Sequence, residues 1–543
     1  MTKKENFVTL KLDFLKDETM IQVNNVSLQF GAKKIFDEVN LKFTKGNCYG
    51  VIGANGAGKS TFLRILSDDL SPTKGDVTIS KNERLSVLIQ NQEAFNDKTV
   101  LETVMLGHKR LTEIIKLKDA LYSKENFTEE DGMKAAELEG EFAELNGWEA
   151  ESEAEMLLNS LQIPSEFYHE LMQKVEPKLK VKILLAQALF GNPDILILDE
   201  PTNNLDAKTV RWLEKFLQNC ENIIIIVSHN RHFLNQVCTH ICDVDYGKIN
   251  IFPGNYDFWY ESNQLILRQQ KEANKKMETR MNELQEFIAR FSANASKSKQ
   301  ATSRKKELEK ITLIDIKPSS RRYPYIDFKY EREPGNDILF VENLTKKGMF
   351  KDVSFIVNKN DKIAFLSDEE IKITALFDIL NGKDKDYEGK FWFGKTITPI
   401  YLPQNYNDYF DGVKLNLIEW LAQFSKEKDI TFLRSWLGRM LFSGEDALKS
   451  AKVLSGGEKV RCMLSKVMLA GGNFLTFNEP TNHLDLESIT ALNKGLINFK
   501  GNILISSHDH ELLQTVANRI IKIDKTKEYD KVITYDEYLD EQN

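Results

Sequence analysis

A glycine-rich stretch, GANGAGKS, occupies Gly53–Ser60 and fits the pattern G-x-x-x-x-G-K-[ST]. It follows the apolar run YGVI and precedes TFLRIL, which is typical of a helix. Glycines let the backbone wrap around a phosphate with its N–H groups pointing inward. We expect Lys59 to place its charge on the β- and γ-phosphates and the Ser60 hydroxyl to bind Mg²⁺. The residues expected to form this cradle are Gly53, Ala54, Asn55, Gly56, Ala57, Gly58, Lys59, Ser60 and Thr61.

Two acids end the apolar stretch ILILDEP at Ile195–Pro201, which is typical of a buried strand. A carboxylate buried without a partner is costly, so acids at such a strand end usually serve an ion or a reaction. We expect Asp199 to bind Mg²⁺ directly or through water, and Glu200 to polarise an attacking water as general base. Together with the glycine-rich loop, the acids predict hydrolysis of a terminal phosphate.

Three further side chains are candidates for the same site. His229 follows the apolar run IIIIV, and a second histidine, His508, follows a matching run near the C-terminus. A lone histidine is more often structural, but this repetition favours a role near the γ-phosphate. Gln90 ends LSVLIQ, from where it can reach the metal ion and the water. Phe30 is a candidate to stack on adenine, with packing in the core as the alternative.

A second glycine-containing motif, LSGGEKVRC, places Ser-Gly-Gly before a pattern that is typical of a helix. The first turn of a helix offers free N–H groups and a positive dipole end, so it can bind an anion. Because the Ser-Gly-Gly loop itself has no lysine, we expect it to contact only the outer face of a phosphate held elsewhere. The residues concerned are Leu454, Ser455, Gly456, Gly457 and Glu458.

The elements that must position these residues occur twice along the chain. DILILDEPTNNLD at Asp194–Asp206 matches NFLTFNEPTNHLD at Asn473–Asp485. IIIIVSHNRHFL at Ile223–Leu234 matches NILISSHDHELL at Asn502–Leu513, and strand-like segments that open each half match in the same order. Apolar strands followed by helical patterns predict two copies of one α/β domain with a mostly parallel sheet.

The segment between the copies, from about Glu261 to Arg322, has a different character. Glycine and proline are absent until Pro318, and charges recur at helical spacing. We predict an antiparallel helical hairpin with a basic tip at Ala293–Arg304, with a solvated charged linker as the alternative. The basic residues toward this tip are Arg290, Lys297, Lys299, Arg304, Lys305 and Lys306.

The expected domains are a first domain at 20–261 with a helical, arm-like insert at about 95–155, a linker at 262–322 and a second domain at 323–543. Residues 1–19 are either a short tail or sequence upstream of a start at Met20.

Composition excludes several classes of protein. The 543 residues are too many for one ordinary core, and no apolar run approaches the roughly 18 residues of a membrane span. The start lacks a secretory signal, and five scattered cysteines suit a reducing compartment, so we expect a cytoplasmic protein without a membrane partner. Cys238, His240 and Cys242 suggest a metal site, but buried structural cysteines are the favoured interpretation because no second ligand pair lies nearby. The net charge of −8 means that any contact with nucleic acid must come from a local basic patch.

The phosphate loop, the glutamine after a strand, LSGGE, the strand ending in DEP and the late SH together resemble ABC-type ATPase domains. Two such domains on one chain, EPTNHLD and the charged helical linker are similar to the ABC-F proteins of translation, from about Ile21 to the end. The short linker and the arm-like insert resemble a bacterial subgroup of that family. The resemblance implies an α/β fold with two tandem P-loop ATPase domains, each with a mostly parallel core sheet and antiparallel β and helical subdomains.

The same resemblance implies ATP and Mg²⁺ as cofactors. It implies two ATP sites in a monomer whose domains pair head to tail, with the phosphate loop of one domain facing the LSGGE of the other. It further implies binding at the ribosomal exit site, where the linker at 262–322 would reach tRNA and rRNA.

One of the two sites is damaged in the sequence. In the second copy the phosphate loop reads LSDEEIKITAL, where Ser367 takes the place of the first glycine and Ile373 that of the lysine. Lys372 stands one place too early, and Asn478 replaces the first acid of DEP. LTKKGMF is too short to hold an adenine-stacking aromatic residue. In the first copy the LSGGE position reads VEPKL at Val175–Leu179, where Glu176 and Pro177 remove the glycine N-terminus.

Under head-to-tail pairing all of these losses fall in one site, so we expect one intact hydrolytic site and one degenerate site. The degenerate site keeps Gln404, Glu479 and His508, whereas Glu369 and Glu370 would repel phosphate. This site either binds nucleotide weakly or is only packed.

The expected function is that of a ribosome-associated ATPase whose closure on ATP presents the linker to RNA. Hydrolysis would then release the ribosome. Three alternatives stay open: a non-hydrolysing clamp that binds RNA or ribosomes, an antibiotic-protection factor of the same family, and the motor subunit of a transporter.

Overall fold

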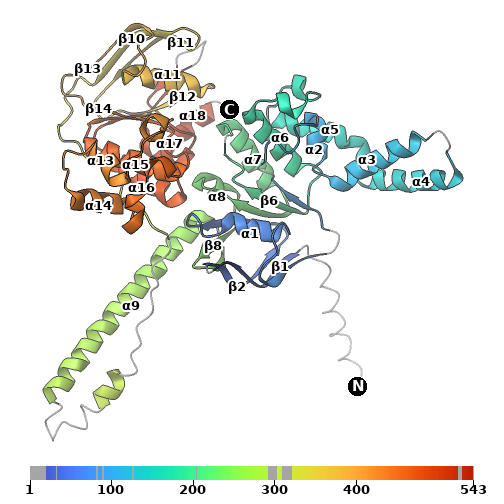
Figure 1. Ribbon diagram of the computed structural model, residues 1–543, viewed down its shortest axis with the longest axis horizontal. Coiled ribbons are helices and arrows are strands. Elements are labelled where there is room, and N and C mark those ends of the chain that lie inside the picture. The colour runs from blue at the N-terminus through green and yellow to red at the C-terminus, as the bar shows by residue number, and fades with distance from the viewer. Residues whose placement is uncertain are drawn as a thin grey trace. The chain divides into compact units, whose positions relative to one another are not determined.

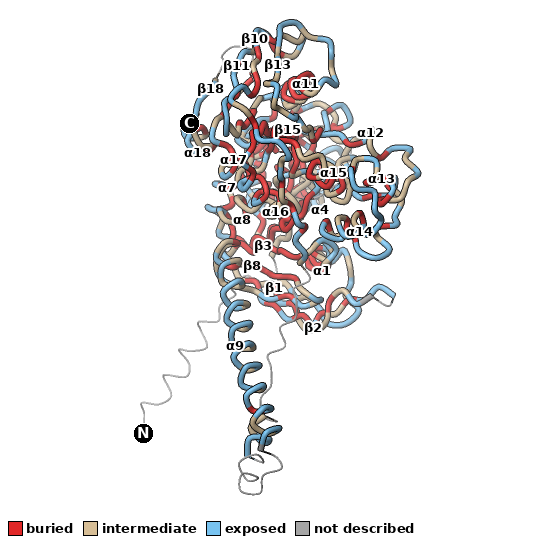
Figure 2. The backbone as a smooth tube through the Cα atoms, turned by 90° about the vertical axis from the view of Figure 1, so that its left-hand side faces the viewer, coloured by how far each residue is buried: buried red, intermediate tan, exposed pale blue. Residues whose placement is uncertain are grey.

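The computed structural model describes residues 20–31, 33–80, 83–88, 91–124, 127–203, 205–291, 303–308, 321–523 and 529–541. The chain forms two compact units that separate near Arg321, and we call them the first and the second domain (Figure 1). Each domain has its own buried core, built from β-branched, leucine and aromatic side chains of the strands and their covering helices. Figure 2 shows that the buried residues lie mainly in these strands and helices.

The first domain contains a six-stranded sheet in the order β5-β6-β7-β3-β8-β9. Its strands are β5 (Leu85–Val87), β6 (Ile195–Asp199), β7 (Ile223–Val227), β3 (Asn47–Gly53), β8 (His240–Asp245) and β9 (Lys248–Pro253). All neighbours are parallel except β8 and β9. A separate antiparallel sheet has the order β2-β1-β4, with β1 (Met20–Phe30), β2 (Lys33–Thr44) and β4 (Lys74–Ile79).

The second domain repeats this topology strand for strand, in the order β14-β15-β16-β12-β17-β18. Its strands are β14 (Pro399–Leu402), β15 (Phe474–Asn478), β16 (Asn502–Ser506), β12 (Lys362–Leu366), β17 (Arg519–Lys522) and β18 (Tyr529–Lys531). Its antiparallel sheet has the order β11-β10-β13, with β10 (Leu339–Lys346), β11 (Phe350–Val357) and β13 (Glu388–Phe393). The predicted pair of α/β domains with mostly parallel core sheets is therefore confirmed.

Matching helices follow matching strands in the two domains. In the first domain they are α1 (Lys59–Leu66), α6 (Pro177–Leu189), α7 (Ala207–Gln218) and α8 (Arg231–Val237). In the second they are α11 (Glu370–Leu380), α15 (Gly456–Ala470), α16 (Leu486–Asn498) and α17 (His510–Val516), with the additional helices α12 (Asn407–Phe410), α13 (Leu417–Ala422), α14 (Ile430–Arg439) and α18 (Tyr535–Glu541). Short 3₁₀ turns occupy Gly147–Glu149, Ser165–Phe167, Met172–Lys174, Gly444–Leu448 and Ala451–Val453.

The insert of the first domain is helical. It contains α2 (Val100–Met105), α3 (Lys109–Tyr122), α4 (Glu129–Glu144) and α5 (Ala150–Ser160). The helices α3 and α4 lie side by side as an arm, where Arg110 Nε donates to Glu141 Oε1 at 2.6 Å and Lys118 Nζ lies 2.8 Å from Glu139 Oε2 (Figure 1). The second domain has no matching pair of helices among its described residues.

A helix of 36 residues, α9 (Tyr256–Phe291), leaves the first domain. It begins before the predicted linker boundary because Tyr256 and Trp259, which lie in its first turns, are buried. A short helical segment at 303–308 returns beside it, and Arg280 Nη2 donates to Glu307 Oε1 at 2.7 Å. Most of the predicted basic tip, residues 293–302, lies outside the described residues.

Across the described parts of the chain, no helix combines the length and the apolar character that are needed to cross a bilayer.

Candidate nucleotide site

The glycine-rich loop connects β3 to α1 in the first domain, as predicted. Gly58 is the N-cap of α1 and has a φ of 105°, and Gly56 has a φ of 75°. These left-handed conformations favour glycine. A Cβ atom on Gly58 would also lie 2.8 Å from Ile35 Cγ2 and 2.8 Å from Phe36 Cζ, so the loop can pass over the antiparallel sheet only without a side chain here. The loop shape is therefore set by backbone conformation and by close packing together.

Lys59 is the first residue of α1, and its side chain turns back into this loop. Its side chain is buried, and its Nζ donates to Gly53 O at 2.8 Å and to Ala54 O at 3.4 Å. The ammonium group is thus folded against the carbonyls of its own loop, inside the curve of the backbone. Ser60 follows in the first turn of α1. No acidic side chain in this turn neutralises the positive end of the helix dipole. This arrangement suits a polyphosphate.

The two predicted acids stand at the end of β6. Asp199 is the last residue of this strand, and Glu200 follows with a φ of 52°. The Glu200 N–H donates to Val227 O at 2.8 Å, which fixes this unusual backbone turn against the end of β7. A left-handed, non-glycine residue at a strand end is a form of strain that often accompanies functional sites.

The strand register brings the three motifs to one edge of the sheet. Val227 of β7 pairs with Val51 of β3 on one side and with Asp199 of β6 on the other. Since the strands are parallel, the phosphate loop, the acids and His229, which comes two residues after Val227, all leave the sheet at the same edge. The predicted grouping of these motifs at one strand edge is therefore present in the backbone.

Two other predicted residues are placed less fully. Phe30 ends β1 with 53% of its surface exposed, so the alternative of a core position is wrong. Gln90 lies outside the described residues.

The LSGGE motif forms the start of α15 in the second domain. Ser455 is the N-cap, its N–H donates to Glu458 Oε2 at 2.9 Å, and its Oγ accepts from the Glu458 N–H. A Cβ on Gly456 would lie 2.9 Å from His483 Cγ, and one on Gly457 would lie 2.7 Å from His483 O. The glycines are thus required by the packing of the EPTNHLD turn as well as by an anion site, a reason that the sequence alone does not reveal.

The corresponding helix of the first domain, α6, begins differently. Glu176 is its N-cap, without a side-chain cap bond, and Pro177 is its first residue. Proline has no N–H, and an acid at the N-cap would meet a phosphate with like charge. The VEPKL segment therefore lacks the glycines and the first N–H that the start of α15 has.

The second domain keeps the strand edge of the nucleotide site. Glu479 follows β15 with a φ of 50°, and its N–H donates to Ser506 O at 2.9 Å, as Glu200 does in the first domain. Burial raises the pKa of Glu479, and the neighbouring His508 ring opposes this shift. Asn478 and Ile373, which replace an acid and a lysine, are both buried.

The cysteines are free thiols in this structure, and both cysteines of the suggested metal motif are buried. Cys238 and Cys242 are buried free thiols, burial raises the pKa of Cys242, and Cys48 Sγ lies 3.9 Å from Cys238 Sγ. No metal-binding group of three or more His, Cys, Asp or Glu side chains occurs among the residues that the structure describes. The favoured interpretation of structural cysteines therefore agrees with their surroundings.

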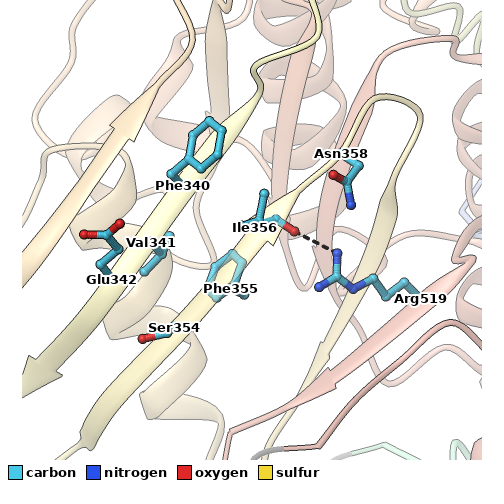
Figure 3. Close-up of a pocket in the computed structure, with 8 residues that line it drawn as sticks. All are labelled: Phe340, Val341, Glu342, Ser354, Phe355, Ile356, Asn358 and Arg519. Carbon is cyan, nitrogen blue, oxygen red and sulfur yellow. Dashed lines mark hydrogen bonds between the residues drawn. The ribbon is translucent and has the colours of Figure 1, made fainter.

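A pocket of about 530 Å³ lies on the antiparallel sheet of the second domain (Figure 3). Phe340, Ile356 and Arg519 are among its lining residues, and Arg519 Nη1 donates to Ile356 O at 2.8 Å. None of the predicted nucleotide residues lines it, so we assign none of this chemistry to it.

Comparison with known proteins bears on these motifs. Two family models, both described as ABC transporter, match residues 36–203 and 242–328. The first covers the phosphate loop and the DEP strand end, and the second covers α9.

Similar chains extend over nearly the whole sequence. The ABC transporter ATP-binding protein YkpA of Bacillus subtilis is 60% identical over 96% of this chain and 97% of its own length. The probable ATP-binding protein YbiT of Escherichia coli O157:H7 is 43% identical over 96% of this chain and 99% of its own length. ABC transporter F family member 2 of Arabidopsis thaliana is 30% identical over 93% of this chain and 76% of its own length.

Solved structures share the fold. RNase-L Inhibitor matches with a TM-score of 0.61 and 16% identity, covering 96% of this chain and 92% of that chain. An archaeal ribosome recycling factor, aABCE1, solved with the ribosomal stalk protein aP1, matches with a TM-score of 0.58 and 17% identity over 95% and 92%. At such identity these matches speak for the fold alone, whereas the 60%, 43% and 30% identical relatives show that the chain belongs to the ABC-F type of ATP-binding proteins.

Proposed function

We propose that this protein hydrolyses ATP at one composite site and acts as a ribosome-associated translation factor. The observation that carries the proposal is the meeting of the phosphate loop with Asp199, Glu200 and the His229 segment at one edge of the first sheet. Each of these positions carries the residue type that phosphoryl transfer to water requires.

The proposed roles follow from the chemistry of the side chains. Lys59 and the loop N–H groups neutralise the charge that develops on the β- and γ-phosphate oxygens. Glu200 accepts the proton of the attacking water, and His229 orients the γ-phosphate from the neighbouring strand. ATP and water thereby give ADP and phosphate.

The residues at this edge fit a magnesium ion. The Ser60 hydroxyl and the Asp199 carboxylate are oxygen donors of the kind that Mg²⁺ prefers, and Gln90 is the third proposed ligand. When bound, Mg²⁺ neutralises phosphate charge and aligns the terminal phosphate.

We further propose that the second domain completes this site from outside. The start of α15, with Ser455, Gly456 and Gly457, is the LSGGE-type helix N-terminus, and its counterpart begins with Glu176 and Pro177. Head-to-tail pairing therefore unites every intact part in one site. Hydrolysis would reopen the domains.

The proposed partner is the ribosome near its exit site, with the 262–322 linker contacting tRNA and rRNA. One neighbour of the same fold is described as a ribosome recycling factor. Most residues of α9 are exposed or half-buried, and basic residues occur along the linker and at its predicted tip. Phosphate contacts of this kind release counterions, so binding should weaken as salt rises.

The central test uses Glu200→Gln. Removing the general base while keeping shape and hydrogen-bonding capacity should leave ATP bound and the domains closed. We expect phosphate release to fall by about 10²- to 10⁴-fold and ATP-dependent co-sedimentation with ribosomes to increase.

The matched control is Glu479→Gln, which makes the same change at the corresponding position of the second domain. It should leave phosphate release close to that of the unchanged protein. An equal loss of turnover in both variants would contradict one-site hydrolysis. Turnover no higher than background in the unchanged protein would favour the non-hydrolysing clamp.

A further inference from the structure

The phosphate loop of the second domain has become part of a helix. The repeat aligns Gly56 with Glu370 and Lys59 with Ile373. The helix α1 begins at Lys59, whereas α11 begins at Glu370, three residues earlier in the aligned frame. The loop residues Gly56–Gly58, which precede α1 in the first domain, therefore correspond to a helical turn in the second.

Two backbone amides and the lysine of this short loop have partners inside it. The Lys372 N–H donates to Glu369 O at 3.0 Å, and the Glu369 N–H donates to Ser367 Oγ at 3.2 Å. The Lys372 ammonium, on a side chain only 3% exposed, lies 2.9 Å from Glu369 Oε1. Neither these amides nor the lysine of the loop is thus directed at an outside anion.

Carboxylates surround the remaining histidine of this site. His508 Nε2 lies 3.2 Å from Glu370 Oε1 and 3.7 Å from Glu479 Oε1, and the His508 N–H donates to Glu479 Oε2 at 3.3 Å. Glu479 matches Glu200 of the first domain, so the carboxyl group that a γ-phosphate would meet here in addition is that of Glu370. Like charges at such distances disfavour its binding.

An uncharged network stands at the aligned position of the metal ligands. Asn478 Nδ2 donates to Thr374 Oγ1 at 2.9 Å, and this hydroxyl donates to Gln404 Oε1 at 3.4 Å. Asn478 aligns with Asp199, and Thr374 aligns with Ser60. The amide and the hydroxyl bind each other and offer a divalent cation no carboxylate.

From these contacts we infer that the second site binds no nucleotide and that Glu370 and Lys372 are the residues that exclude ATP. Glu370 takes the histidine that a γ-phosphate would use, and Lys372 is committed to a carboxylate of its own loop. The inference rests on the proposed function in one respect: we expect the site at Lys59 to bind one ATP, so any second bound nucleotide would have to lie in the second site.

The test counts nucleotides on the full-length chain. Glu200→Gln keeps bound ATP intact during the measurement, so equilibrium dialysis with radiolabelled ATP and Mg²⁺ gives the number bound per chain. The same count on Glu200→Gln with Lys59→Ala identifies the site. We expect one nucleotide per Glu200→Gln chain, and we expect Lys59→Ala to weaken all of this binding.

Two results would overturn the inference. One is a count of two nucleotides per chain. The other is a class of binding sites whose affinity for ATP is unchanged by Lys59→Ala. A count of zero for both variants would instead reject the proposed ATPase. It would not contradict the inference, because the second site would still hold no nucleotide. The two proposals therefore fail in different ways.

Discussion

Glu200 and Glu479 share a left-handed backbone, with φ values of 52° and 50°. Such a conformation costs an ordinary residue on the order of 1 kcal/mol or more. In both domains the N–H of the glutamate is fixed by a carbonyl of the neighbouring strand. The strained turn is therefore a property of the sheet edge, and the residues around it decide whether the edge serves a reaction. Asp199 precedes one glutamate, and the uncharged Asn478 precedes the other.

A lysine on α15 gives a prediction at the same scale. Lys466 is half-buried, and its Nζ lies 3.9 Å from the centre of the Tyr409 ring. Burial, with a smaller contribution from Lys383, lowers the pKa of Lys466 to about 8. Because the folded pKa is below the unfolded value, the folded state is disfavoured where the lysine is charged. The folded state is therefore more stable while Lys466 is neutral. This stability is lost as pH falls through about 8 and is recovered as pH rises toward 10.

We therefore expect Lys466→Met to raise the melting temperature above that of the unchanged protein, and this increase should be larger at pH 7 than at pH 10. The change between the two pH values should be about 1 to 2 kcal/mol, since the partial exposure of the group screens the full effect. Thermal melts from pH 7 to pH 10 measure it. Lys452→Met, an exposed lysine of the same domain, serves as the control and should show no such trend. A pH-independent difference for Lys466→Met would contradict the role of burial.

At the scale of elements, α1 and α11 show what the sequence could predict. The repeat predicts both helices, both sheets and the grouping of motifs at the strand ends, because hydrophobic patterning and turn residues act locally. The absence of glycine in LSDEEIKITAL indicates a damaged loop. It does not predict that the helix begins at Glu370, or that Glu370 contacts His508, because such contacts join residues far apart in the sequence.

The LSGGE helix shows the same limit. The glycines predict an anion site, yet Gly456 and Gly457 also lie against His483, which no local pattern reveals. Similarly, the start of α9 is earlier than charge patterning suggests, because the aromatic residues of its first turns belong to the first domain. Tertiary packing determines where α9 begins and why glycine is needed at the start of α15, and amino-acid composition does not predict such packing.

An extended strap, Arg321–Gly335, carries the chain from the linker into the second domain. Arg321 Nε lies 3.0 Å from Glu487 Oε1 at the start of α16, and both side chains are less than 8% exposed. The Tyr325 N–H donates to Arg439 O at 2.8 Å, and the Phe328 ring packs on the ring of Phe477, 5.6 Å away. The strap is thus fixed to the second domain, and Ile326 and Phe328 belong to its core.

The buried ion pair of this strap should be costly to break from one side. We expect Arg321→Met to lower the free energy of unfolding of the second domain by about 3 to 5 kcal/mol, because Glu487 would stay buried with less compensation. Arg321→Met combined with Glu487→Met should regain most of this loss, since two apolar chains can pack there. Chemical denaturation of the three variants measures the coupling.

The control for the strap lies a few residues further along it. Lys426 and Glu331 form an ion pair whose side chains are 74% and 62% exposed. Lys426→Met should change the free energy of unfolding by less than about 1 kcal/mol. Equal effects of Arg321→Met and Lys426→Met would show that burial does not set the value of these pairs.

At the scale of the whole molecule, the two domains share one topology but divide the chemistry between them. The first domain has the intact phosphate loop and strand edge, and the second has the intact helix N-terminus at Ser455. Proposed head-to-tail pairing turns this division into one functional site. It also makes hydrolysis in the first domain depend on a residue of the second.

This dependence can be tested with a reciprocal pair of substitutions. Ser455→Asp keeps a good N-cap but sets a negative charge where the γ-phosphate is proposed to lie, as Glu176 does at the matching position of α6. We expect it to lower kcat by about 10²- to 10³-fold, in the range found when a transition-state donor is lost. Glu176→Ser should leave kcat within about twofold, because under the proposed pairing α6 belongs to the second site, which we infer to bind no nucleotide. Steady-state phosphate release, with melting temperatures to confirm folding, measures both, and a Ser455→Asp chain with unchanged kcat would rule out head-to-tail completion of the site.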